Sequence, residues 1–374
     1  MDKRIGEAVS YLGREDYDAL VATAHGQNVF ANVYIDSNAV YVFSGVRVLA
    51  ESAVVIERSG RSTLVVTPAW DAERASAASR TDATVGCDDL AEGLEKVLAG
   101  SNVNREKIVT LGLPLLGRDL SKKIEGVLGG RRPSNESLAN HIGRIRNPEE
   151  VAAARKATEI AEIGYKRLLE IARPGMREFE LAADLYCTMK ELGAEDNFLL
   201  LTASQHNQAV RAAGRRVLDV GDIIISEITP CYRGQFVQIC RTTVIGEPSP
   251  LLREKYAVLQ TAMRRGQAEA VPGTPVREVA KAMNGAFADA GYDKYCRPPY
   301  MRVRGHGLGI TSDRPGDIAD DSTVVLEEGM LFVMHPNQYI PETGYLMCGE
   351  PVVITKYGAE SLSSRDAQLD VIEV

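Results

Sequence analysis

The sequence of 374 residues lacks several features that would each indicate a particular class of protein. It has no run of about 18 apolar residues, so it predicts no membrane span. It has no segment dense in lysine and arginine, and its net charge of −8 argues against a nucleic-acid-binding surface. Its first residues lack the apolar core of a signal peptide, so we expect an amphipathic helix there and a cytoplasmic protein.

The cysteines also lack the close spacing that is typical of metal-binding or redox sites. The six cysteines are scattered, and no two form a CxxC pair. This pattern predicts reduced thiols rather than a disulfide framework. Cys231 and Cys240 flank a predicted turn, and we expect both to pack rather than to react.

What remains is an ordinary globular composition, with 45% hydrophobic and 25% charged residues. A chain of this length predicts two domains. We expect an α/β domain over residues 1–140 and a second domain over residues 141–374. In the first domain the pattern predicts strands at 18–23, 39–43, 52–57 and 62–67. It predicts helices there at 72–78, 89–99 and 121–127.

The second domain opens with a helix start signal and contains an internal repeat. Asn147 can cap a helix that has Pro148 at its first position. That helix is followed by Pro174-Gly175 and a second helix, and the same order recurs around Pro272-Gly273 with an offset of 272 − 174 = 98. Duplicated helix-plus-sheet halves that face one another predict a cup with a ligand between them.

The stretch from Gly221 to Thr242 predicts a β-hairpin within the first half of this repeat. It contains two polar residues that do not suit packing, Glu227 and Gln238, separated by 238 − 227 = 11 positions. Across a hairpin this spacing brings both side chains to one pocket.

This hairpin resembles the first metal-site hairpin of the pita-bread family, which includes methionine aminopeptidase, prolidase, aminopeptidase P and creatinase. Gly221-Asp222, Gly234 and Arg241-Thr242 fit the family frame, but Glu227 and Gln238 replace its two aspartates. The resemblance implies an α+β pita-bread catalytic domain after a smaller creatinase-type domain. It also implies a homodimer whose active site is completed by the partner's N-terminal domain.

Three further positions extend the resemblance. His306 lies in the family's Gly-His-Gly motif, His335 stands where peptidases carry a metal-binding Glu, and Glu350 falls on the last ligand carboxylate. An amide and an imidazole in place of two carboxylates remove two negative charges, which disfavours a pair of divalent ions. The set is most similar to the metal-free branch, creatinase and ectoine hydrolase.

We therefore expect a metal-independent hydrolase that cleaves a C–N bond of a small amino-acid-like amidine, guanidine or cyclic amide. Glu227 would act as base or nucleophile, His306 and His335 would transfer protons, and Glu350 would fix a cationic nitrogen. No cofactor is expected. The residues leave room for a single zinc or iron ion on Glu227, His306, His335 and Glu350.

Other residues are predicted to bind the substrate. Gln238 lies beside Glu227, Tyr345 begins the final motif, and His206 precedes the Gly-Asp turn, where the family has a histidine. Asp313-Arg314 follows His306 and replaces the family's second histidine motif. By the resemblance, Arg47 would reach the active site of the partner subunit.

Several alternatives remain open at this point. The chain could be a mononuclear metal-dependent hydrolase or an Xaa-Pro-type aminopeptidase, or it could run lyase or decarboxylase chemistry. It could also be a non-catalytic binding module on the same scaffold. The exchanged residues are polar or ionisable rather than apolar, which favours altered chemistry over lost chemistry.

Overall fold

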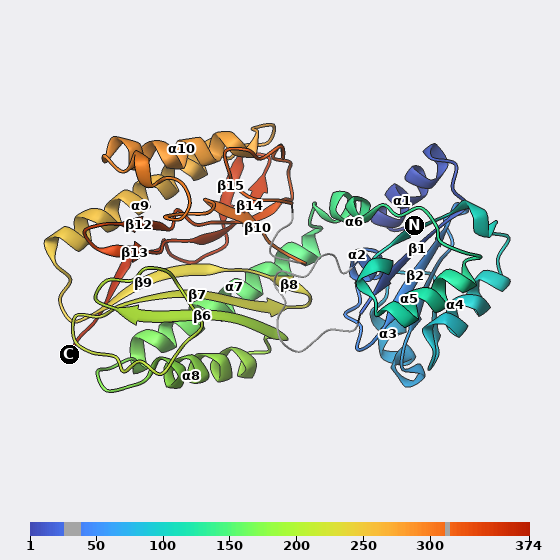
Figure 1. Ribbon diagram of the computed structural model, residues 1–374, viewed down its shortest axis with the longest axis horizontal. Coiled ribbons are helices and arrows are strands. Elements are labelled where there is room, and N and C mark those ends of the chain that lie inside the picture. The colour runs from blue at the N-terminus through green and yellow to red at the C-terminus, as the bar shows by residue number, and fades with distance from the viewer. Residues whose placement is uncertain (26–38, 311–314) are drawn as a thin grey trace. The chain divides into compact units, whose positions relative to one another are not determined.

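The computed structural model describes residues 1–25, 39–310 and 315–374. Contacts divide the chain into two compact units, with the boundary between Gly143 and Arg144. The predicted boundary lay between residues 140 and 141. The first unit is coloured blue to green in Figure 1, and the second green to red.

The first unit is a five-stranded sheet with helices, ordered β4-β3-β2-β1-β5. The pairs β1–β2 and β2–β3 are antiparallel, and β1–β5 and β3–β4 are parallel. Its strands are β1 (Ala19–Ala24), β2 (Ser52–Glu57), β3 (Ser62–Val66), β4 (Ala83–Gly86) and β5 (Ile108–Leu111). Its helices are α1 (Lys3–Arg14), α2 (Ala39–Ser44), α3 (Ala72–Ala78), α4 (Leu90–Ala99), α5 (Arg118–Val127) and α6 (Glu136–Gly143).

One predicted element of this unit is wrong, because residues 39–43 form the helix α2 instead of a strand. Every residue of α2 is buried, so the run shows no alternation that could distinguish a buried strand from a buried helix. The Ser44 hydroxyl donates to the Val40 carbonyl, and Gly45 ends the helix at φ +73°. The other predicted strands and helices are confirmed within a few residues.

The second unit contains the predicted repeat of two helices followed by strands. The first half has α7 (Pro148–Ile171), α8 (Glu178–Glu191), β6 (Asp196–Ser204), β7 (Ile223–Tyr232), β8 (Gln235–Phe236) and β9 (Ile239–Ile245). The second half has α9 (Pro250–Glu269), α10 (Val276–Asp289), β10 (Gly305–Gly307), β11 (Leu331–Met334), β12 (Gln338–Ile340), β13 (Gly344–Leu346), β14 (Glu350–Thr355), β15 (Gly358–Ser361) and β16 (Leu369–Ile372).

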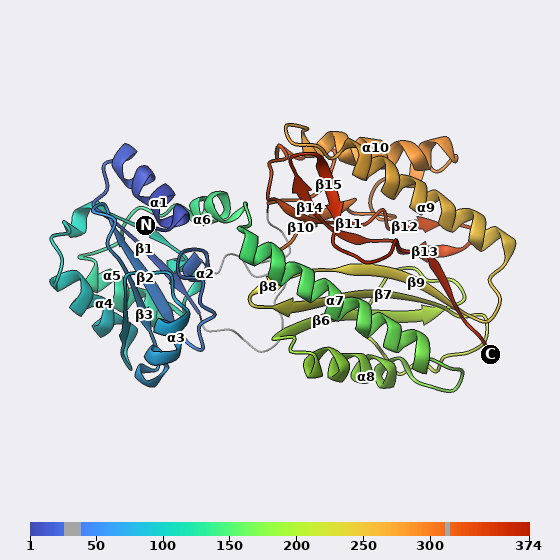
Figure 2. The ribbon, with the colours of Figure 1, turned by 180° about the vertical axis from the view of Figure 1, so that it is seen from behind.

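The strands of this unit form sheets ordered β16-β9-β7-β6, β10-β11-β14-β15 and β12-β13. Figures 1 and 2 show α9 and α10 on one side of the strands, and α7 and α8 on the other side. Only the first of these sheets combines strands of the two halves, since β16 pairs with β9. The two larger sheets meet at single bridges, Cys240 with Gly349 and Phe236 with Gly309.

The strand β9 separates two hydrophobic cores, because its side chains alternate between its two faces. Cys240 and Val244 belong to the core that includes residues of α9 and α10. Ile239 and Ile245 belong to the core that includes residues of α7 and α8. This alternation decides which side chains of β9 can reach a given site.

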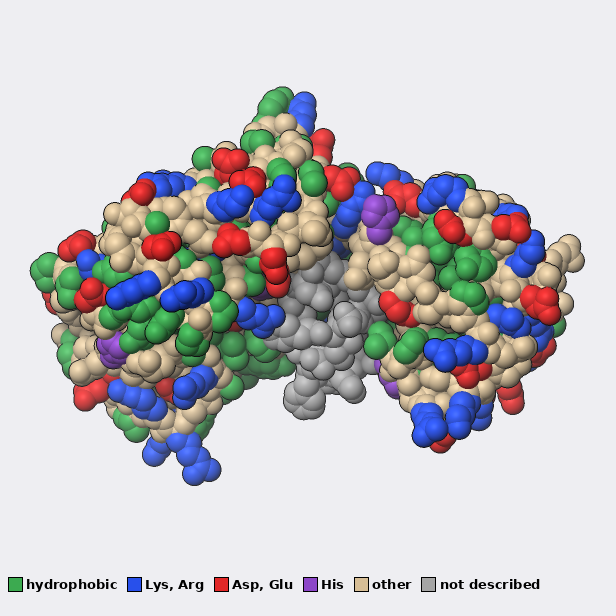
Figure 3. Space-filling model, turned by 45° about the horizontal axis from the view of Figure 1, so that its top comes forward, with side chains coloured by type: hydrophobic (Ala, Val, Ile, Leu, Met, Phe, Trp, Pro, Cys, Tyr) green, Lys and Arg blue, Asp and Glu red, His purple; other side chains and the backbone are tan. Residues whose placement is uncertain are grey.

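Two surface observations complete the description. No helix in the described part of the chain is both long and apolar enough to cross a membrane. On the face shown in Figure 3, basic and acidic side chains are interspersed.

The start of α7 gives a test of the helix cap. The Asn147 side chain accepts from the Glu150 backbone N–H at 2.8 Å, and the Glu150 carboxylate accepts from the Asn147 backbone N–H at 3.1 Å. Losing this capping box in Asn147→Ala should lower the free energy of unfolding by about 1 kcal/mol, measured by urea denaturation. The exposed Lys156→Ala on the same helix serves as control, and equal stability of the two variants would contradict the assignment.

Candidate active site

Glu227 occupies the middle of β7, directly opposite Cys240 of β9. Its side chain is only half-buried by surface area, yet enough protein surrounds the carboxyl group that burial raises the pKa of Glu227 to about 7. The Gln238 amide donates to Glu227 Oε2 at 3.4 Å. The prediction that the hairpin brings Glu227 and Gln238 together is confirmed.

His306 and His335 form the second part of the site. Their ring centroids are 5.2 Å apart at an interplanar angle of 67°. His306 Nδ1 lies 3.0 Å from the Gly307 carbonyl oxygen, which suits a tautomer with the proton on Nδ1 and a lone pair on Nε2. His335 is buried, and this burial, together with the nearby His306, lowers the pKa of His335 to about 3. The lowered pKa favours a neutral imidazole on His335.

Unsatisfied polar atoms cluster around these groups. His335 Nδ1 and Gln238 Oε1 are buried without a hydrogen-bond partner, and Asn337 Nδ2 has only the Cys240 thiol, a weak acceptor, beside it. Buried polar atoms of this kind usually have a partner, so the site is expected to receive one from a ligand. Sequence reasoning missed Asn337, and its only signal was its place two residues after His335 at the end of a predicted strand.

Gly349, the residue before β14, lies against His335. A Cβ atom added to Gly349 would lie 2.7 Å from the Cβ of Cys240 and 2.9 Å from the Cβ of His335. Gly349 therefore faces the site with its backbone alone, and no larger side chain fits there without a shift of its neighbours.

Glu350 is held elsewhere, by a buried ion pair. Its Oε1 lies 3.1 Å from Arg241 Nη2, both side chains are 1% exposed, and the Ser363 hydroxyl also donates to the carboxylate. Burial raises the pKa of Glu350, although the Arg241 charge opposes this. The Glu350 carboxylate is thus bound by Arg241 and Ser363.

The remaining predicted residues are placed as follows. Tyr345 lies near Glu227, since burial and the Glu227 charge raise the pKa of its phenol. His206 is exposed, with Nε2 at 2.9 Å from the Pro341 carbonyl oxygen and its ring edge-on to Tyr339. The carbonyl oxygen of its neighbour Asn207 accepts a hydrogen bond from the Tyr345 backbone N–H at 2.6 Å. His206 is therefore next to the residue that binds the Tyr345 backbone.

Two other predictions are not placed at the site. Arg47 belongs to the first unit, where its carbonyl oxygen accepts from Arg74, and its role in a partner's site stays a prediction. Asp313 and Arg314 lie outside the described residues.

A comparison with protein-family models matches residues 152–356 to metallopeptidase family M24. This span covers more than half of the chain and includes every site residue described above. The chain belongs to metallopeptidase family M24. The predicted membership of the pita-bread family is thereby confirmed.

Curated relatives match about 60% of this M24 chain. The Xaa-Pro dipeptidase of Pyrococcus furiosus is 30% identical over 228 residues, which is 60% of this chain and 64% of that protein. An uncharacterized peptidase, YqhT, of Bacillus subtilis is 28% identical over 231 residues, or 61% and 64% of the two chains. The match thus spans less than two thirds of the length of these relatives.

Solved structures share the fold over nearly the whole chain. The prolidase from Pyrococcus horikoshii OT3 has a TM-score of 0.83 at 22% identity and covers 98% of this chain and 100% of its own. The X-Pro aminopeptidase from Thermotoga maritima MSB8 has a TM-score of 0.80 at 21% identity and covers 100% of both chains. These structures confirm the predicted α+β fold with its N-terminal domain.

The expectation of a metal-independent hydrolase similar to creatinase and ectoine hydrolase is wrong. It is overturned by the match to a metallopeptidase family and by relatives named Xaa-Pro dipeptidases. The expectation that no cofactor is needed falls with it. The loss of two negative charges disfavours a pair of ions. A single ion needs fewer anionic ligands and binds neutral imidazole well.

The donor atoms present fit one metal ion better than two. The rings of His306 and His335 and the carboxyl group of Glu227 offer nitrogen and oxygen ligands, and His335 Nδ1 is buried without a partner. Gln238 is neutral, and Glu350 is paired with Arg241. Among residues 1–25, 39–310 and 315–374, however, no three His, Cys, Asp or Glu side chains already converge tightly enough to hold an ion.

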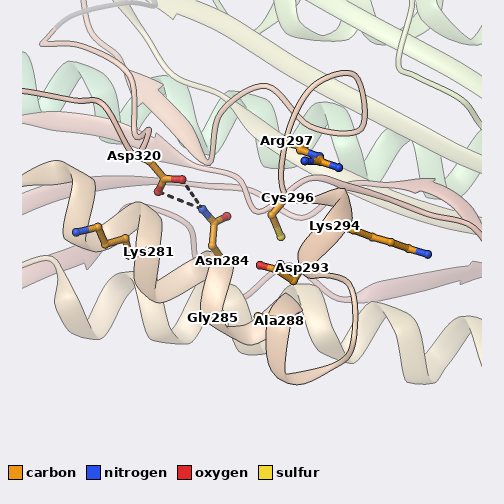
Figure 4. A pocket seen from close by; sticks show the side chains of 9 residues that line it. All are labelled: Lys281, Asn284, Gly285, Ala288, Asp293, Lys294, Cys296, Arg297 and Asp320. Carbon is orange, nitrogen blue, oxygen red and sulfur yellow. Dashed lines mark hydrogen bonds between the residues drawn. The ribbon is translucent and has the colours of Figure 1, made fainter.

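One cavity is lined by residues of α10 and of the segment that follows it, and by none of the groups above. It has a volume of about 820 Å³. Figure 4 shows Asn284 donating to Asp320 within it, and Lys281 and Lys294 pointing outward. Size alone does not make this cavity the active site, because the unpartnered donors and acceptors described above lie near Glu227 and His335.

The ion pair of Arg241 with Glu350 generates a stability test. Arg241→Met leaves a buried carboxylate without its partner, which should cost about 3–5 kcal/mol of unfolding free energy in urea denaturation. The double variant Arg241→Met/Glu350→Leu should lose clearly less than the two single variants added together. Arg265→Met, which breaks an exposed pair with Asp289, is the control and should cost about 0–1 kcal/mol. Additive losses would contradict the pairing.

Proposed function

We propose that this chain is a metal-dependent hydrolase of peptide-type C–N bonds that cleaves small Xaa-Pro-type dipeptides. The proposal rests on the M24 match together with one observation on the site, the edge-to-face pair of imidazoles on His306 and His335. Gly349 lies against both His335 and Cys240, and Cys240 is opposite Glu227. The relatives named Xaa-Pro dipeptidase support the substrate class.

A single divalent ion would be held by Glu227, His306 and His335. When bound, such an ion supplies an activated water and polarises the scissile carbonyl. The contact of His306 Nδ1 with the Gly307 carbonyl fixes that ring, as in many metal-binding histidines. Because the donors are not yet assembled, we expect a weaker, more readily exchanged ion than in a preformed site.

Other residues would position the substrate amide. Asn337 Nδ2 faces only the weak acceptor Cys240 and suits a carbonyl oxygen better, and Gln238 Oε1 is an unmet acceptor suited to an N–H group. Tyr345 keeps its proton at neutral pH, since its pKa is raised, and can donate to the substrate. Donor and acceptor together complement an amide better than an amidine or guanidine, which offer donors alone when charged.

The test is hydrolysis of Leu-Pro and Gly-Pro by protein stripped with chelator and then loaded with zinc, manganese or cobalt. We expect release of free amino acids only after loading. His306→Ala and His335→Ala should each lose bound metal by elemental analysis and lower kcat/KM by at least about 100-fold.

His141→Ala, an exposed histidine of the first unit, is the control for these variants. It should retain both metal and activity. Dipeptide hydrolysis that survives full metal removal, or full metal content in His306→Ala and His335→Ala, would overturn the proposal.

The variant Gln238→Glu tests the proposal that the neutral amide of Gln238 limits the site to one ion. The new carboxylate would lie beside Glu227, where the amide nitrogen is now 3.4 Å from Oε2. Two adjacent negative charges repel each other unless a cation lies between them, so the variant should bind divalent ions more tightly, with stoichiometry rising above one per chain. Titration calorimetry measures this, with the exposed Gln208→Glu as control, and an unchanged stoichiometry and affinity would contradict it.

A further inference from the structure

Arg304 is one of the two largest side chains that the fold encloses completely, and the other is Arg241. Arg241 has a carboxylate partner in Glu350. Arg304 has no such partner among the described residues, because all four acceptors that its guanidinium contacts are neutral. A buried charge without a counter-ion costs free energy of folding, so stability alone does not account for Arg304.

One carboxylate, that of Asp320, reaches Arg304 only indirectly. Asp320 accepts from Asn284 Nδ2 at 3.2 Å, and Asn284 Oδ1 accepts from Arg304 Nε at 2.7 Å. Burial lowers the pKa of Arg304 to about 10, although Cys296 and Asp320 oppose this shift. The guanidinium therefore stays charged at neutral pH, and its Cζ lies 4.3 Å from the centre of the Phe287 ring.

The other contacts of Arg304 lie on the segment that carries His335. The Arg304 carbonyl oxygen accepts from the His335 backbone N–H at 2.9 Å. Arg304 Nη1 donates to the Asn337 carbonyl oxygen at 3.2 Å, and Nη2 donates to Gln338 Oε1 at 2.8 Å. Arg304 thus binds this segment at three of the four positions from His335 to Gln338.

Arg304 is also joined to the second histidine, through the chain itself. Gly305 and His306 follow it directly, and Gly305 pairs with Met334, the residue before His335. One residue is therefore connected to both histidines, to His306 through two peptide bonds and to His335 through hydrogen bonds. Loss of the guanidinium would release the His335 segment while leaving the His306 strand in place.

We propose that Arg304 is a positioning residue that fixes the segment from His335 to Gln338 against β10, and with it the spacing of the two imidazoles. The consequence for catalysis rests on the proposed function, because these imidazoles are two of the three ligands proposed for the metal ion. Arg304 also places Asn337, whose amide is proposed to orient the substrate. Groups that hold a ligand in place from outside commonly change metal affinity by about 10- to 100-fold when they are lost.

The variant Arg304→Lys in the full chain tests this role. Lysine keeps the charge but lacks the planar fork, so it cannot reach all the acceptors of Arg304 at once. We expect zinc to bind about 10- to 100-fold more weakly in titration calorimetry. Nitrogen NMR of isotope-labelled histidine gives a readout without metal, since the chain has five histidines. The ring signals of His306 and His335 should shift, and those of the other three should not.

Arg297→Ala is the control for both measurements. Arg297 is an exposed arginine of the cavity wall beside α10, and its side chain makes none of the contacts described above. This variant should leave the zinc affinity and the histidine signals unchanged.

Chemical rescue separates positioning from a general loss of structure. Asn284 and Cys296, two of the groups that contact Arg304, line the cavity drawn in Figure 4. Through this cavity ethylguanidine can reach the space that Arg304→Ala opens. We expect added ethylguanidine to restore at least about tenfold of the zinc affinity lost in Arg304→Ala, and ethylamine, which lacks the fork, to restore none. Circular dichroism checks that this variant folds, and Arg304→Lys carries the test if it does not.

Unchanged zinc affinity and unchanged histidine signals in Arg304→Lys would overturn the positioning role. If the His306 and His335 signals shift but the wild-type protein neither binds zinc nor hydrolyses Leu-Pro, the positioning role stands and the proposed function falls. If metal-dependent hydrolysis of Leu-Pro is observed and Arg304→Lys alters neither zinc affinity nor kcat/KM, the proposed function stands and the positioning role falls.

Discussion

The structure of the second unit depends on one buried cation, Arg241. It is fully enclosed, and it connects β9 of the first half with Gly349 and Glu350 of the second half. A buried arginine is tolerated only when its charge and its donors are satisfied. The junction of the two halves therefore follows from electrostatics as much as from apolar packing, and Glu350 is committed to this junction.

Alternation along β9 gives the unit two separate chemical environments. Cys240 faces Glu227, Gly349 and His335, while Arg241, the next residue, faces a cavity beside α7. Only one peptide unit separates them.

The features that preserve the family fold differ from the residues that change the charge of the site. The helix pairs, the hairpin and the Gly-His-Gly motif preserve the M24 fold, and TM-scores near 0.8 at about 20% identity show how little sequence the fold requires. By the resemblance, Gln238 and His335 stand where the family carries carboxylates. In the proposed function, the pocket would therefore neutralise fewer cations while keeping nitrogen and oxygen donors for one.

The sequence by itself determined the fold class, the repeat, the cap at Asn147 and the meeting of Glu227 with Gln238, because these depend on local spacing and strand alternation. It could not decide whether residues 39–43 form a strand or a helix, because a run in which every residue is buried shows no alternation of polar and apolar positions. Only the tertiary structure decided the orientation of Glu350 and the exposure of Gly349 to the site. These depend on which face each residue of β14 presents where β14 meets β9, and on a partner, Arg241, more than 100 positions away in the chain.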